Sequence, residues 1–277
     1  WIEDPTNADP AFDRTRARAA LAALAPLGVT APMLAATAAR MRATVGVLDA
    51  AVAERAAGNV ALGLAGEIEI ACVALTGGEP ETAMRLLARA AQALTGAGYT
   101  PRREALERAL DFARAAAAGP MPDAPFTDGV LLSAPRHPSA RLERPVIALC
   151  REPSACAGPL AITSTGTGTH GAPRLWDGRL GLASGMPGLC LAALGEARLT
   201  AIKAAGALHL QGRDVYEAFM SAPRAARLSA PAAIRADGSL EAVFLRDGWA
   251  AGEALNPAPG VFYNAVGRRL DAVFKGV

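Results

Sequence analysis

The chain has 277 residues, of which 52% are hydrophobic and only 5% aromatic, and its formal net charge is +2. This length predicts about two domains, with cores filled mainly by alanine, leucine and valine. The charge is too close to balance to indicate nucleic-acid binding by itself. No apolar run of about eighteen residues is present, so no membrane-spanning helix is predicted.

Two further features of the composition limit the class of protein. Among 28 basic residues only Lys203 and Lys275 are lysines, a bias that a GC-rich genome explains, so the number of arginines carries no argument. The four cysteines form no C-x-x-C pair, and their spacing fits neither a zinc site nor a dense disulfide framework. Reduced, partly buried thiols in a cytoplasmic protein are expected; they are Cys72, Cys150, Cys156 and Cys190.

The first eighteen residues place an acidic, turn-forming segment before a helix that is expected over residues 11–24. Asp9 and Pro10 are expected as the N-cap and the first helical residue. The aspartate oxygen can accept a backbone N–H that has no helical partner, and proline has no N–H to donate. Asp13 falls in the first turn, where negative charge suits the helix dipole.

Three arginines alternate along this helix. At about 100° per residue, Arg14 and Arg18 lie about 40° apart on one face, whereas Arg16 points to nearly the opposite side, beside Phe12. Two adjacent guanidinium groups repel each other unless an anion or a carboxylate lies between them. A phosphate or a nucleic-acid backbone is the expected anion, because arginine stays charged and binds phosphate oxygens through two parallel hydrogen bonds.

The segment up to residue 120 is predicted to be mainly helical. Thr30 is expected to cap a long helix ending near residue 57, and further helices are expected over residues 79–95 and from Pro101 onward. Residues 67–70 alternate like a strand, although residues 60–75 as a whole are ambiguous. Residues 119–122, Gly-Pro-Met-Pro, are expected to mark a boundary.

The remaining part of the chain is predicted to be a small mixed α+β domain. Asp-Gly turns at residues 128, 177, 237 and 247 accompany short apolar runs, a pattern typical of hairpins. Helices are expected over residues 193–206, 212–220 and 261–274. The fold class is therefore α+β, with a helical middle domain followed by the mixed domain.

Several other motifs in the sequence do not indicate a nucleotide-binding or catalytic site. Residues 166–171 read G-x-G-x-x-G, but Pro173, Trp176 and Gly178 follow where a dinucleotide site needs a helix, so a Ser/Thr/Gly loop is favoured. The sequence contains no Walker loop and no G-x-S-x-G elbow. The three histidines are far apart, and surface or packing roles are favoured for His137, His170 and His209.

The opening segment resembles the end of the catalytic domain of tRNA(Ile)-lysidine synthetases. Thr15 departs from the family, which usually has asparagine there. Similar but weaker matches occur at residues 99–102, 149–153 and 175–178, in the order expected for the family. The matching residues of the opening segment are Trp1, Glu3, Asp4, Pro5, Thr6, Asn7, Asp9, Phe12, Arg14, Arg16 and Arg18.

The resemblance implies a ligase that joins lysine to the wobble cytidine of the CAU anticodon of tRNA(Ile). ATP would adenylate the C2 oxygen of the cytidine with loss of pyrophosphate, and the ε-amino group of free lysine would displace AMP. The family's ATP loop, Ser-Gly-Gly-x-Asp-Ser, does not occur in the chain. ATP and Mg²⁺ are therefore expected to bind an N-terminal domain that is missing here, and a fragment that is inactive alone is expected.

In this interpretation residues 1–24 are the tail of an α/β catalytic domain, residues 25–120 a helical domain and residues 121–277 a small α+β domain. The partners are tRNA(Ile), lysine and ATP, with no membrane or DNA; a homodimer is left open. The expected catalytic residues are Arg14, Arg16 and Arg18, and the expected tRNA-binding residues are Asp4, Asn7, Arg102 and Arg103.

Three further arginine patches could face RNA, although each one taken alone is more often a solvent-exposed surface without a ligand. The patches are Arg136 with His137, Arg224 with Arg227, and Arg268 with Arg269. Phosphate contacts of this kind would position RNA without reading its sequence. The alternative from another class is a non-catalytic helical module that binds RNA or acts as a protein-binding adaptor.

Overall fold

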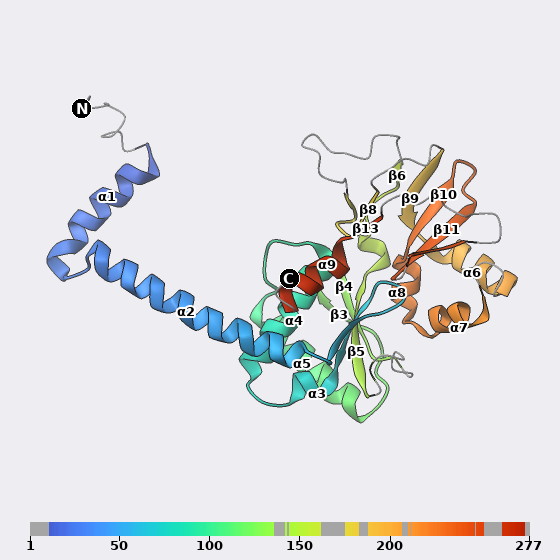
Figure 1. Cartoon of the computed structure of the whole chain (residues 1–277), viewed down its shortest axis with the longest axis horizontal. Coiled ribbons are helices and arrows are strands. Elements are labelled where there is room, and N and C mark those ends of the chain that lie inside the picture. The colour runs from blue at the N-terminus through green and yellow to red at the C-terminus, as the bar shows by residue number, and fades with distance from the viewer. Residues whose placement is uncertain are drawn as a thin grey trace. The chain divides into compact units, whose positions relative to one another are not determined.

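The computed structural model describes residues 11–135, 142, 144–161, 175–182, 188–206, 210, 212–246, 248–251 and 262–274 (Figure 1). The chain divides into two compact units, Trp1–Ala51 and Val52–Val277, and each is described by itself. The described elements combine helices with antiparallel sheets, which confirms the α+β class expected from the sequence.

The first unit consists of two helices. Helix α1 (Asp13–Leu24) is followed by the 3₁₀ turn η2 (Ala25–Leu27) and by α2 (Ala31–Ala56), whose last turns lie in the second unit. The predicted cap of α2 is confirmed, because Thr30 Oγ1 accepts the backbone N–H of Met33 at 3.4 Å. Among the described residues no single helix is long and apolar enough to cross a membrane. The pair formed by α1–η2 and α2, which is bent by 98°, would be long and apolar enough by length and composition only.

Helix α1 begins later than the sequence predicted. The residue that caps its start is Phe12, in extended conformation and without a side-chain cap, so Pro10 is not the first helical residue. Asp9 and Pro10 themselves lie outside the described residues. Asp13 is in the first turn as expected, where its charge complements the helix dipole.

The second unit contains a five-stranded antiparallel sheet with the order β1-β2-β5-β4-β3. Its strands draw on residues on both sides of residue 120, so the segment 25–120 is not purely helical. The reason is that β2 pairs with β5 and is buried along its whole length. The alternation of residues 67–70 indicated a strand, but it did not indicate burial on both faces. The strands are β1 (Val60–Leu62), β2 (Ile68–Ala71), β3 (Ala124–Thr127), β4 (Val130–Ser133) and β5 (Val146–Arg151).

The central strand β5 separates two hydrophobic cores. Because neighbouring side chains on a strand point to opposite faces, Ile147 and Leu149 enter one core while Ala148 and Cys150 enter the other. The first core is closed by α3 (Cys72–Thr76), α4 (Pro80–Thr95), α5 (Arg103–Ala118) and α9 (Ala265–Phe274). Burial on both faces explains why this strand reads as an uninterrupted apolar run.

The second core lies against another five-stranded sheet, β12-β11-β10-β9-β6. Helices α6 (Gly195–Ala205), α7 (Arg213–Ser221) and α8 (Arg224–Ser229) contribute further side chains to this core. The strands are β6 (Leu160–Ala161), β9 (Leu189–Ala193), β10 (Pro231–Arg235), β11 (Leu240–Leu245) and β12 (Gly248–Ala251). A third sheet, β13-β8-β7, joins β13 (Phe262–Asn264), β8 (Leu180–Leu182) and β7 (Leu175–Trp176).

The Asp-Gly turn at residue 177 is a tight hairpin between β7 and β8. Asp177 has φ +51° and Gly178 φ +65°, the pair of positive φ angles that a type I′ turn requires. A Cβ at Gly178 would lie 2.7 Å from the carbonyl oxygen of Thr95, so a larger residue would also clash with the end of α4. The final helix predicted over residues 261–274 begins at Ala265, because Phe262 belongs to β13.

A buried ionic network is built on this turn. The carboxylate of Asp177, whose side chain is 3% exposed, accepts hydrogen bonds from Arg151 at 3.1 Å and from Arg179 at 2.7 Å. Arg151 also donates to the carbonyl oxygens of Gly129 and Ala155, at 2.8 and 2.7 Å. The network therefore ties the end of β5 to the β3–β4 turn and to the β7–β8 turn.

Arg179 extends the network into the second core region. It is 4% exposed, donates to the carbonyl oxygen of Ser229 in α8 at 2.9 Å, and lies 5.2 Å from the ring centre of Trp176. Burial lowers the pKa of its guanidinium, and the adjacent carboxylate of Asp177 opposes that effect. The arrangement satisfies a buried charge that would otherwise be costly.

Replacing Asp177 with asparagine keeps the shape of the side chain but leaves two arginines without their shared counter-charge. We expect Asp177→Asn to lower the free energy of unfolding by about 3–5 kcal/mol, the usual cost of breaking a buried ion pair. Urea denaturation followed by circular dichroism measures the change. Asp111→Asn is the control, since Asp111 pairs with Arg114 on the surface and should cost below about 1 kcal/mol. Equal losses in the two variants would contradict a stabilising role for the network.

Candidate nucleic-acid interface

The three arginines of α1 are exposed, and no residue of this helix is buried. The guanidinium of Arg14 lies 5.0 Å from the ring centre of Phe12, a cation–π contact. The expectation that Phe12 lies beside Arg16 is therefore wrong: Phe12 precedes the helix in extended conformation, so its ring does not follow the helical spacing. Among the described residues, Arg18 has no recorded ion-pair partner.

Arg16 forms an ion pair with Asp13 one turn earlier. Its side chain is 62% exposed and that of Asp13 is 93% exposed, so water and salt screen the pair. Such exposed pairs contribute about 0–1 kcal/mol. A phosphate group could therefore replace the carboxylate at small cost. Two other predicted site residues, Asp4 and Asn7, lie outside the described residues.

Arg102 and Arg103 begin helix α5 in the second unit, and both are exposed. Arg103 pairs through Nε with Glu107 at 2.9 Å. It also lines a groove of about 360 Å³ between α4 and the start of α5. This groove contains two arginines that the sequence argument missed, Arg85 and Arg89. Their spacing of four residues on an amphipathic helix looks the same as an ordinary solvated face.

The other predicted patches are mostly engaged within the fold. Arg224 forms an ion pair with Glu196, and Arg227 is half-buried, so burial lowers the pKa of its guanidinium. Arg269 donates to the carbonyl oxygens of Ala93 at 2.9 Å and Gly178 at 2.6 Å. Arg136 and His137 lie outside the described residues, as do His170 and His209.

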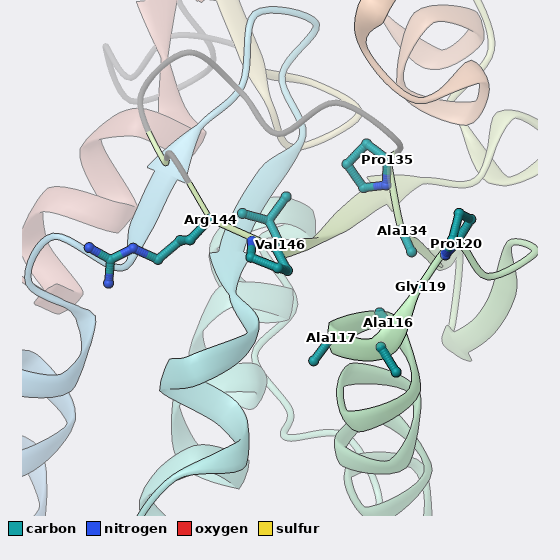
Figure 2. Close-up of a pocket in the computed structure, with 10 residues that line it drawn as sticks. Ala116, Ala117, Gly119, Pro120, Ala134, Pro135, Arg144 and Val146 are labelled. Carbon is teal, nitrogen blue, oxygen red and sulfur yellow. The ribbon is translucent and has the colours of Figure 1, made fainter.

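A second cavity, of about 430 Å³, lies beside the C-terminal end of α5 and the first residues of β5 (Figure 2). Its lining consists of alanine, glycine, proline and valine together with one charged residue, Arg144. Figure 2 shows the guanidinium of Arg144 directed away from Ala116 and Ala117, and it donates to Asn59 Oδ1 at 3.1 Å. The lining residues supply no group suited to acid–base or nucleophilic chemistry.

The cysteines behave as the sequence indicated. All four are free thiols, with Cys72 and Cys150 buried and Cys156 and Cys190 partly buried. Burial raises the pKa of the Cys72, Cys150 and Cys156 thiols, which keeps them protonated and unreactive. Within the described ranges no group of three or more His, Cys, Asp or Glu residues could hold a metal ion.

Two buried carboxyl groups lie at β2: Glu67 immediately precedes the strand and Glu69 is part of it. Glu67 and Glu69 are each 3% exposed, and one oxygen of each has no hydrogen-bond partner. Burial raises the pKa of Glu67 from 4.5 to about 7, and the nearby charge of Glu69 adds to the rise, whereas Arg246 acts in the opposite direction. Glu67 is therefore a titratable group of the core.

This α+β chain is similar to a known protein over part of its length. No family model matches the sequence, and no solved structure matches it. The chain is similar to the tRNA(Ile)-lysidine synthase of Ruegeria pomeroyi, with 37% identity over 114 residues. The matched stretch covers 41% of this chain and 27% of that synthase. The resemblance seen in the sequence is thereby confirmed over this stretch.

The raised pKa of Glu67 gives a testable pH dependence. The Glu67 carboxyl group binds its proton more tightly in the folded state than in the unfolded chain. Its protonation therefore contributes to the free energy of unfolding fully below pH 4.5, and this contribution is lost as the pH rises through about 7. We expect Glu67→Gln to raise the free energy of unfolding at pH 8, by on the order of 3 kcal/mol. Denaturation between pH 4.5 and 8.5 measures the effect, with exposed Glu217→Gln as control. A pH dependence that Glu67→Gln leaves unchanged would contradict the assignment.

Proposed function

We propose that this chain is part of a tRNA(Ile)-lysidine synthetase, a cytoplasmic ligase that forms a carbon–nitrogen bond between lysine and the wobble cytidine of a CAU anticodon. The observation that carries the proposal is the 37% identity over 114 residues to a synthase of that name. The opening motif, with Arg14, Arg16 and Arg18 in the positions of the family pattern, supports it independently of composition.

Within this proposal the chain contributes contacts to tRNA and a cationic edge to the active site. Exposed arginines suit both tasks, since a guanidinium presents a fixed fork of donors to phosphate oxygens. Arg14, placed against the ring of Phe12, loses less side-chain freedom on binding than an unsupported arginine would. Negative charge that develops on a phosphoryl group would be stabilised by a guanidinium held in advance at that position.

ATP and Mg²⁺ are required by the proposed reaction, but the described residues do not fit them. No cluster of three or more candidate ligands occurs in the described ranges, and the groove beside α5 has one carboxylate among its lining residues. No step of the reaction is therefore assigned to a carboxylate of this chain. The proposed roles of the described residues are to bind and position RNA.

A protein-binding adaptor is the second candidate, and one observation favours it. The first unit exposes large apolar side chains that soluble surfaces usually limit, among them Leu27 at 77%, Val47 at 71% and Met41 at 63%. An adaptor would bind a protein through these residues and would need neither the arginines of α1 nor tRNA. The two candidates therefore differ in their response to arginine substitutions.

We expect Arg14→Ala, Arg16→Ala and Arg18→Ala each to lower single-turnover incorporation of labelled lysine into a tRNA(Ile) transcript at least tenfold, because each removes positive charge near RNA or phosphate. The substitutions are made in a chimera that joins these 277 residues to the ATP-binding N-terminal domain that the family resemblance implies. The melting temperature should change little, since no residue of α1 is buried.

Arg42→Ala is the control for this experiment, because Arg42 is an exposed arginine on α2 outside the motif. It should retain activity within twofold of the parent. Full activity in all three α1 variants would contradict the proposed role of these arginines. A parent chimera that folds and binds ATP, but neither binds tRNA nor incorporates lysine, would favour the adaptor.

A further inference from the structure

We infer that the groove between α4 and the start of α5 binds a phosphate group of an RNA backbone through Arg85, Arg89 and Arg103. The inference rests on the proposed function and deepens it, because it assigns a contact site for RNA to two arginines of α4. All of its lining residues belong to the second unit, and none of them is an arginine of α1.

The geometry brings donors from two helices to one hollow. Arg85 and Arg89 are four residues apart on α4 and therefore share a face of that helix, while Arg103 comes from the first turn of α5. All three line a groove of about 360 Å³. Clefts of about 300–1,000 Å³ commonly hold small ligands, so a nucleotide unit with its phosphate fits this space.

The lining is rich in donors and poor in competing anions. Gln92 and Thr100 add an amide and a hydroxyl to the three guanidiniums, and Glu81 is the single carboxylate among the lining residues. The floor is apolar: Met84 and Leu106 are buried there. A surface with positive walls and an apolar floor suits a phosphate attached to a sugar or a base better than an acidic peptide side chain.

Two of the arginines are oriented before any ligand arrives. Arg85 donates through Nε to Glu81 at 2.9 Å, and Arg103 donates through Nε to Glu107 at 2.9 Å. Both bonds use Nε, so neither of them engages the terminal nitrogens that would form a two-pronged contact with phosphate. Side chains held in this way lose less conformational entropy on binding.

The test is the affinity of the 277-residue chain for a tRNA(Ile) transcript, measured by fluorescence anisotropy at several salt concentrations. We expect the triple variant R85Q/R89Q/R103Q to bind at least tenfold more weakly than the parent. The slope of log affinity against log salt should fall in magnitude by about 1, as for the loss of one neutralised phosphate. The control R40Q/R42Q/R114Q removes the same charge from exposed arginines outside the groove and should bind within twofold of the parent.

Three outcomes would overturn the inference, each for a different reason. Unchanged tRNA affinity in R85Q/R89Q/R103Q, with a folded circular dichroism spectrum, would remove the groove as a site while leaving the proposed function intact. Binding of inorganic phosphate that the same variant abolishes, without any loss of tRNA affinity, would identify free phosphate as the ligand. No tRNA binding by the parent chain at low salt would contradict both the inference and an RNA-binding role for this chain.

Discussion

The arrangement of the second unit depends on the carboxylate of Asp177. It lies at the tip of the β7–β8 hairpin, 3% exposed, and accepts hydrogen bonds from Arg151 and Arg179. Arg151 ends the strand shared by the two main cores, and Arg179 reaches α8 through Ser229. A buried charge of this kind tolerates few geometries, because each partner must be satisfied at once. It therefore ties the end of β5 to the β7–β8 hairpin and to α8.

This constraint separates the arginines of the chain into two groups. Arg151, Arg179 and Arg269 point inward and donate to carboxylate or carbonyl oxygens of distant segments, so they hold the fold together. The arginines of α1 and of the α4–α5 groove are exposed or partly exposed, and three of them, Arg16, Arg85 and Arg103, pair with carboxylates three or four residues away. Surface pairs are weak and easily exchanged. Only the second group is suited to contact a polyanion.

The sequence predicted local structure well and long-range structure poorly. Helical periodicity located α2, α4 and α5 to within a few residues, and the Asp-Gly pairs predicted the hairpins at residues 128, 177 and 237. The pairing of β2 with β5 joins residues 75 to 81 positions apart, and no local pattern encodes it. The family-like segments at residues 149–153 and 175–178 are separate in the sequence, and the structure joins them through the ion pair of Arg151 with Asp177. The groove arginines were missed because an arginine on an amphipathic helix looks the same whether it faces water or a ligand.

The central claim, that surface arginines meet RNA while buried arginines hold the fold, can be tested by chemical footprinting. The chain is treated with an arginine-specific dicarbonyl reagent with and without tRNA(Ile), and modified peptides are quantified by mass spectrometry. The account predicts that tRNA protects Arg14, Arg18, Arg89 and Arg103, that Arg114 reacts equally in both samples, and that Arg179 stays unmodified in both. Protection confined to other arginines, or none at concentrations where the tRNA is bound, would contradict it.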